Sequence, residues 1–171
     1  MMRRGDRMGL GYRYKCSECS KKYEVFQGIG MLFPEGYEDT VAKLKNGRFG
    51  KVWKELYENT ENVAIDAEKR VYLCPLCGYW KNEPGLSLYV ADNEEAISAV
   101  KNGCPIFYGD DSIPAMMGDM PKYHLLKEYE HKCKKCGGKM KAADDDEMLT
   151  LPCPKCGGAP DPENTMYILW D

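Results

Sequence analysis

The chain has 171 residues, of which 43% are hydrophobic, and its formal net charge is −3. This length allows one ordinary domain or two small ones, and no apolar run approaches the roughly 18 residues of a membrane span. Nucleic-acid-binding proteins usually carry a basic surface, so the net acidity argues against a broad phosphate-binding footprint. Only residues 1–60 lean basic, with 12 basic and 8 acidic groups.

Cysteine usage indicates the compartment. Eight of the nine cysteines form CxxC pairs, here called knuckles, and residues 1–11 are basic without an apolar core. We therefore expect no signal peptide at this start and a reducing cytoplasm, in which the thiolates serve metal binding and not a disulfide framework.

The first half contains the same unit twice. Residues 11–16 (GYRYKC) alternate aromatic and polar side chains, which predicts a strand entering the knuckle Cys16/Cys19. A second short strand is expected at residues 23–26. The unit recurs at RVYLCPLCGYW, around Cys74/Cys77, and a strand is expected at residues 86–90. Gly78 follows the second knuckle, whereas Ser20 follows the first, so the first departs from the pattern.

Between these knuckles lie 54 residues, far more than a hairpin needs. Tyr37, Val41 and Leu44 fall at helical spacing, and Gly47 would end that helix. A second amphipathic helix is predicted by five apolar residues at its spacing. These are Phe49, Val52, Trp53, Leu56 and Tyr57.

Residues 91–122 are predicted to connect two halves. Asp92 and Glu95 resemble a capping box before a short helix that Gly103 stops. CPIFY at residues 104–108 reads as a half-buried strand, and residues 109–121 as a loop. Cys104 fits a packed thiol better than a reactive one, because no histidine or acid is tied to it by motif.

The strongest signal is at residues 132–158, where sixteen residues separate the last two knuckles. This is the spacing of a four-cysteine structural zinc site. Each of these knuckles is followed by Gly-Gly, which suits a turn with positive φ. We expect an acidic turn at residues 142–146 and a strand at 148–151 between them. Residues 123–131 and 165–170 would complete a three-stranded sheet.

Spacing favours sequential pairing of the four knuckles. The first expected site comprises Cys16, Cys19, Cys74 and Cys77. The second comprises Cys133, Cys136, Cys153 and Cys156. Crossed pairings need longer loops, but doubling a loop costs only about 0.6 kcal/mol, so they stay open.

The predicted fold class is therefore a small, metal-stabilised α+β protein with two four-cysteine zinc ribbons. Residues 11–90 form the N-terminal ribbon with a two-helix insertion, residues 91–122 the connecting helix and loop, and residues 123–171 the C-terminal ribbon. Two Zn²⁺ ions are the expected cofactors, and loading them would lower the net charge from −3 to −7.

Iron is the alternative metal. The turns CPLCGYWKNEPG and CPKCGGAPDP are similar to the two knuckles of rubredoxins, which bind one iron with four thiolates for electron transfer. The resemblance covers only these turns, and the two turns are expected in different sites. Zinc and iron both accept four sulfurs in a tetrahedron, but the long insertion and the ribbon spacing favour zinc.

The N-terminal half, about residues 12–90, resembles an uncharacterised family of bacterial zinc-ribbon proteins. The motifs that carry this are YKCSEC, GIGMLFP, AID and CGYWKNEPGLSLYV. The resemblance implies a ribbon with a helical insertion and no activity. The C-terminal half resembles only generic zinc ribbons.

An enzyme is not expected, because four thiolates leave a zinc ion no open position for water or substrate. The histidines are His124 and His131. His131 precedes Cys133 by two residues and is a possible substitute ligand, although four cysteines are already available. His124 is expected to be an ordinary strand or loop residue.

Three function classes remain. A protein-interaction or scaffold module is the leading interpretation, with Leu32, Phe33 and Tyr37 in the helical insertion as the expected partner-binding residues and the partner itself unknown. Weak nucleic-acid binding is second. It would use basic residues of the start with the tyrosines near the first knuckle, namely Arg3, Arg4, Arg7, Tyr12, Arg13 and Tyr14. Iron-based electron transfer is third. No membrane association or small-molecule substrate is inferred.

Overall fold

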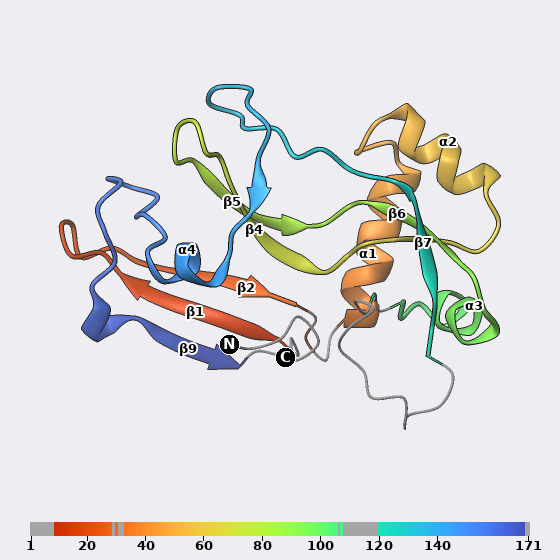
Figure 1. Ribbon diagram of the computed structural model, residues 1–171, viewed down its shortest axis with the longest axis horizontal. Helices are drawn as coiled ribbons and strands as arrows, with labels where there is room; N and C mark the ends of the chain where they lie inside the picture. Colours follow the sequence, from red (N-terminus) through yellow and green to blue (C-terminus); the bar gives the residue numbers. More distant parts are fainter. Residues whose placement is uncertain (1–8, 29, 31–32, 106, 108–119, 170–171) are drawn as a thin grey trace. The chain divides into compact units, whose positions relative to one another are not determined.

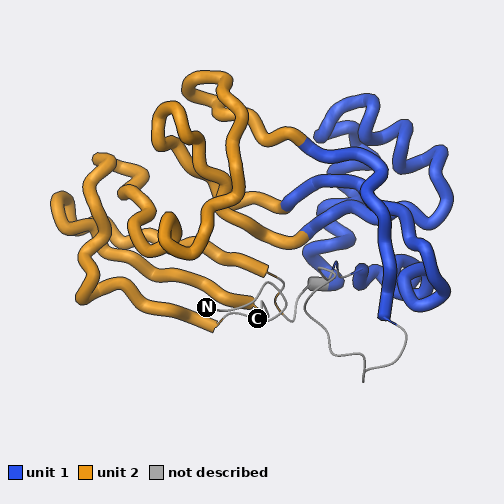
Figure 2. The backbone as a smooth tube through the Cα atoms, viewed as in Figure 1, with its two compact units in different colours: residues 1–7, 31–67, 85–129 blue, residues 8–30, 68–84, 130–171 orange. Residues whose placement is uncertain are grey.

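The computed structural model describes residues 9–28, 30, 33–105, 107 and 120–169. Several predicted features fall wholly or partly outside this part: the basic start, Leu32, residues 106 and 108 of the expected strand 104–108, residues 109–119 of the expected loop, and residue 170 of the expected last strand. Within the described part, the helices are all too short or too polar to cross a membrane. The chain folds into two compact units, each built from three separate stretches of sequence (Figure 2).

Unit 1 comprises Met1–Arg7, Met31–Ala67 and Gly85–Tyr129. Its centre is an antiparallel sheet in the order β3-β6-β7, with α1 against β3 and α3 against β6 (Figure 1). Its elements are α1 (Phe33–Lys45), α2 (Lys51–Asn59), β3 (Val63–Ile65), β6 (Leu88–Ala91), α3 (Glu94–Lys101) and β7 (Tyr123–Lys127).

The two helices expected in the insertion are present. α1 buries Tyr37 and Leu44, which the helical spacing had placed on one face. It ends before Gly47, whose φ of 76° lets its N–H reach the Leu44 carbonyl. α2 follows at once, and its Trp53 donates Nε1–H to the carbonyl of Leu86 at 2.8 Å. The insertion therefore packs on the sheet of its own unit.

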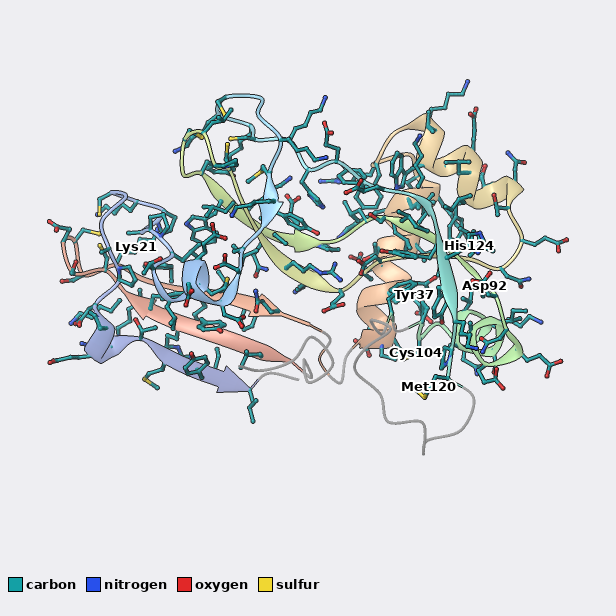
Figure 3. All side chains as sticks on the ribbon, in the orientation of Figure 1. Lys21, Tyr37, Asp92, Cys104, Met120 and His124 are labelled. Atoms are coloured by element: carbon teal, nitrogen blue, oxygen red, sulfur yellow. The ribbon has the colours of Figure 1, made fainter. Side chains whose placement is uncertain are left out.

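The cap of α3 differs from the prediction by one residue. Asn93, not Asp92, is the N-cap, and its side chain accepts hydrogen bonds from the N–H groups of Ala96 and Lys122. Asp92 instead faces His124 across β6 and β7, with 2.6 Å between Oδ1 and Nδ1 (Figure 3). The carboxylate therefore has a partner elsewhere.

Unit 2 comprises Met8–Gly30, Glu68–Pro84 and Glu130–Asp171. It holds two antiparallel sheets, in the orders β2-β1-β9 and β5-β4-β8. Its elements are β1 (Leu10–Lys15), β2 (Lys22–Gln27), β4 (Lys69–Leu73), β5 (Trp80–Pro84), β8 (Lys141–Ala142), α4 (Asp145–Leu149), the 3-10 turn η1 (Pro162–Asn164) and β9 (Met166–Leu169).

The two sheets of unit 2 are joined through β2 and β4. Gly28 and Lys69 exchange backbone hydrogen bonds of 2.9 and 3.2 Å. The Asn82 side chain bonds both the N–H and the carbonyl of Phe26, each at 2.8 Å. The core between the sheets and α4 includes five fully buried side chains, namely those of Tyr14, Val25, Val71, Met148 and Leu151. The two sheets therefore share one core.

Three expected strands are placed differently. Residues 148–151 were expected as a strand, but α4 takes the first two of them, because Asp144 and Glu147 form a capping box that starts a helix there. β7, within the segment 123–131, pairs with β6 of unit 1. β9, within 165–170, pairs with β1 near the start of the chain.

The compact units therefore do not follow the predicted division at residues 11–90, 91–122 and 123–171. All eight knuckle cysteines lie in unit 2, and the long insertion forms unit 1 together with residues 85–129. The α+β class is confirmed.

Candidate metal centres

The structure forms two groups of four cysteines, but their pairing is nested. Site A comprises Cys16, Cys19, Cys153 and Cys156. Site B comprises Cys74, Cys77, Cys133 and Cys136. The first knuckle thus meets the fourth and the second meets the third, so the predicted sequential pairing is wrong.

Strand pairing explains the nested arrangement. After the third knuckle, β8 runs beside β4, with Leu73 opposite Lys141, and this keeps the third knuckle next to the second. The chain leaving the fourth knuckle runs beside β1, where Asp161 N–H bonds the Lys15 carbonyl at 2.8 Å. These pairings outweigh the small entropic advantage of a short loop.

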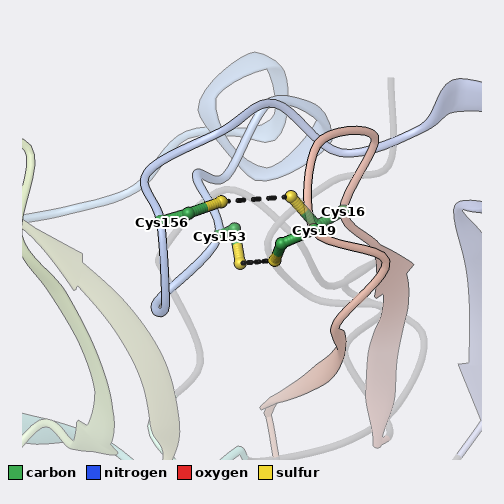
Figure 4. A group of neighbouring side chains, drawn as sticks. All are labelled: Cys16, Cys19, Cys153 and Cys156. Atoms are coloured by element: carbon green, nitrogen blue, oxygen red, sulfur yellow. Dashed lines mark hydrogen bonds between the residues drawn. The ribbon is translucent and has the colours of Figure 1, made fainter.

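The sulfur spacing in site A suits a single tetrahedral ion. Figure 4 shows the two facing pairs, Cys16 with Cys156 and Cys19 with Cys153, whose Sγ atoms are 3.5 and 3.7 Å apart. Four sulfurs at 2.3 Å from a central ion lie about 3.8 Å from one another. A disulfide would need about 2.0 Å, and these cysteines are free thiols.

Site B repeats this geometry. The Sγ atoms of Cys74 and Cys136 are 3.5 Å apart, as are those of Cys77 and Cys133. In each site the four sulfurs all lie within 4.8 Å of one another. Both sites therefore have the donor set and the dimensions of a mononuclear four-thiolate centre.

All four knuckles use one turn. The residue four after the first cysteine donates its N–H to that cysteine's carbonyl, at 2.8 to 3.1 Å. This residue has positive φ in each case. The four are Ser20 (57°), Gly78 (71°), Gly137 (74°) and Gly157 (77°). The first knuckle therefore has the same turn as the others, although its serine adopts a conformation that favours glycine.

The second glycine of each C-terminal Gly-Gly pair has a separate role. A Cβ on Gly138 would lie 2.7 Å from the Leu76 side chain, and one on Gly158 would lie 2.5 Å from that of Glu18. Both contacts are too short for a side chain. These glycines let the opposing knuckle approach closely, which the sequence alone did not indicate.

Backbone donors favour the thiolate form in both sites. Burial acts to raise the pKa of Cys133, but N–H groups of Cys136 and Lys135 point at its sulfur and lower the pKa to about 6. Burial likewise acts to raise the pKa of Cys153, but N–H groups of Cys156 and Lys155 point at its sulfur and lower the pKa to about 7. In site B the pKa of Cys74 is also lowered, because the effect of its burial is outweighed by N–H groups of Leu76 and Cys77. A thiolate is the form that binds metal, so both sites favour the metal-binding form at some of their cysteines.

Three aromatic side chains hold the segment before the fourth knuckle. The hydroxyls of Tyr14 and Tyr23 donate to the carbonyls of Met148 and Leu151, each at 2.7 Å. Trp80 Nε1–H donates to the carbonyl of Pro152, also at 2.7 Å. The sequence indicated a strand residue or a nucleic-acid contact for Tyr14 and no role for Trp80, because these bonds span more than seventy residues.

The other candidate residues lie apart from these sulfur groups. His131 is 3% exposed and stacks on Tyr72 at 3.6 Å, with its Nδ1 3.7 Å from Glu83, and the site B ligand group does not include it. Cys104 belongs to unit 1 and is half-buried, but it lies in the turn after α3 and not in a strand (Figure 3).

The expected partner-binding residues are not supported as a surface. Tyr37 is 4% exposed, because α1 turns it into unit 1, and burial raises the pKa of its hydroxyl above the ordinary range. Leu32 and the side chain of Phe33 lie outside the described residues. Tyr37 therefore serves the core.

No family model, curated protein or solved structure matches this chain. The resemblance to bacterial zinc-ribbon proteins stays a prediction, and the site is argued from its own geometry.

The nested pairing predicts the outcome of two matched quadruple serine variants. Replacing Cys16, Cys19, Cys153 and Cys156 removes site A alone, so the variant should retain one metal ion per chain. Replacing Cys16, Cys19, Cys133 and Cys136 breaks both sites and should leave none. Elemental analysis of the purified proteins measures both. Sequential pairing is indicated instead if the first variant holds no metal.

Proposed function

We propose that this chain is a non-enzymatic protein that binds two structural zinc ions and acts as a protein-interaction or scaffold module. The observation that carries the metal assignment is the presence of two closed sets of four thiols with tetrahedral spacing. Bound zinc would cross-link the two knuckles of each site and offset half of the thiolate charge. Four thiolates leave no ligand position for substrate.

Zinc is favoured over iron by the way the knuckles are distributed. The two turns that resemble rubredoxin, around Cys77 and Cys156, lie in different sites. Neither site therefore combines both rubredoxin-like halves. Zinc-bound thiolates also agree with a reducing compartment such as the cytoplasm.

Metal analysis tests the zinc assignment. Protein made in medium containing both zinc and iron should carry two zinc ions per chain and be colourless. Sites of this kind contribute on the order of 10 kcal/mol to folding, so a strong chelator should unfold unit 2. The measurement is a partial loss of the far-UV circular dichroism of the chain. A red protein with iron charge-transfer bands would contradict the assignment.

The interaction role rests on β9. In the described part of unit 2, β9 is the end strand of its sheet, with β1 on one side. Its sequence, MYIL, carries no charge, and Met166, Tyr167 and Leu169 are 53%, 60% and 87% exposed. An uncharged, apolar edge strand is a template for pairing with another strand.

A second copy of the chain is the proposed occupant of this edge. Antiparallel pairing of β9 with its own copy about a two-fold axis would form a continuous six-stranded sheet and bring no like charges together. Four residues bury far less than the roughly 1,600 Å² of a standard stable interface. The dimer should therefore dissociate on dilution.

The matched variants are Leu169→Lys and Leu76→Lys, since both leucines are highly exposed in unit 2, at 87% and 76%. Sedimentation equilibrium should show a monomer–dimer equilibrium for the wild type and for Leu76→Lys. Leu169→Lys should be monomeric, because each lysine would place a charge on the apolar edge, opposite Met166 of the other copy. A wild-type protein that stays monomeric at high concentration, or a dimeric Leu169→Lys, would refute the proposal.

Nucleic-acid binding is less well supported. Tyr12 and Tyr14 are 4% and 0% exposed, so neither ring is available to stack on a base. Arg13 is paired with Glu24 at 2.5 Å. The aromatic part of that alternative is therefore lost.

A further inference from the structure

We infer that the two metal sites fill in order, site B before site A, and that Trp80 couples them. This inference rests on the proposed function, since it requires that both sites bind zinc. It adds that zinc in site B raises the affinity of site A, so that the two ribbons assemble as one unit and not independently.

The nested pairing gives the two sites unequal loops. Closing site B joins Cys77 to Cys133 across 55 residues, whereas closing site A alone joins Cys19 to Cys153 across 133. Once site B is closed, the free chain between these two site A cysteines falls to 70 residues, because the segment between the second and third knuckles is bypassed. Halving a loop makes its closure roughly threefold more favourable.

A direct contact adds to this entropic effect. Trp80 is three residues beyond Cys77 and lies opposite Leu73, the residue before Cys74. Closing the second knuckle therefore fixes both ends of the hairpin that carries Trp80. The indole then donates to the carbonyl of Pro152, next to Cys153 of site A, at 2.7 Å. Site B thus positions a ligand of site A.

Tyr23 provides an internal comparison. Its hydroxyl donates to Leu151, the residue before Pro152, at the same 2.7 Å. Tyr23 belongs to β2, which leads away from the first knuckle and so from site A itself. Loss of this bond should weaken site A whether or not site B is filled. Loss of the Trp80 bond should weaken site A only when site B is filled.

The size of the coupling follows from the shorter loop and the Trp80 hydrogen bond. A hydrogen bond of this kind contributes a few-fold to roughly tenfold in an equilibrium constant. With the loop effect, zinc in site B should raise the affinity of site A by roughly tenfold. Linkage makes the effect reciprocal, so site A raises the affinity of site B by the same factor.

The order of filling is tested on the full chain with one equivalent of zinc under reducing conditions. Iodoacetamide labelling and peptide mass spectrometry should show the site B cysteines more strongly protected than the site A cysteines, and singly loaded chains should carry their zinc mainly in site B. Equal protection of both sites, or protection of site A first, would overturn the order.

The coupling is tested by Co²⁺ titration, read from the thiolate-to-cobalt charge-transfer absorption. Site A affinity is compared between the chain with site B loaded and the double variant Cys74→Ser, Cys77→Ser. The double variant should bind at site A roughly tenfold more weakly. Trp80→Phe should weaken site A severalfold with site B loaded and leave it unchanged in the double-variant background. Tyr23→Phe should weaken it equally in both.

Two kinds of failure are separable. If the wild type binds fewer than two cobalt ions, the proposed function itself fails. If it binds two but site A has the same affinity with site B loaded or removed, only the coupling fails. Equal effects of Trp80→Phe in the two backgrounds would remove Trp80 from the coupling role. Circular dichroism at saturating metal checks that each variant reaches the folded state.

Discussion

The organisation of unit 2 depends on the close approach of cysteine sulfurs. Within each site these sulfurs come from two knuckles that are far apart in the sequence, yet they lie within hydrogen-bonding distance of one another. Four thiolates at 3.5 to 3.7 Å repel strongly unless a cation lies between them. Within the described residues of this unit, each sheet has three strands, and one strand, β8, has two residues. Sheets this small seldom bury enough apolar surface to be stable alone. A metal ion in each site would therefore stabilise unit 2 together with the shared core.

The sequence was sufficient for the local structure around each candidate metal site. The CxxC spacing identified the eight candidate ligands, and the glycines after three knuckles indicated the positive-φ turn that all four adopt. Hydrophobic periodicity likewise located α1 and α2. These features depend on residues a few positions apart, where the chemistry of one turn decides the conformation.

The pairing of the knuckles could not be predicted in this way. Sixteen residues between Cys136 and Cys153 match a hairpin, but this stretch instead pairs β8 with β4 and then forms α4. α4 carries the chain to the first sheet, where Tyr14 and Tyr23 hold it. Loop length separates the alternatives by only about 1 kcal/mol. Long-range hydrogen bonds determine which knuckles pair, and no local sequence pattern predicts these bonds. The capping box at Asp144 was visible in the sequence but was assigned to a turn.

Ligand assignment by ¹¹³Cd NMR tests the central claim most directly. The protein is loaded with two equivalents of ¹¹³Cd²⁺, and each metal signal is correlated through bonds with the β-protons of its cysteine ligands. The nested arrangement predicts that one cadmium correlates with Cys16, Cys19, Cys153 and Cys156, and the other with the remaining four knuckle cysteines. A single cadmium that correlates with both Cys16 and Cys74 would contradict it.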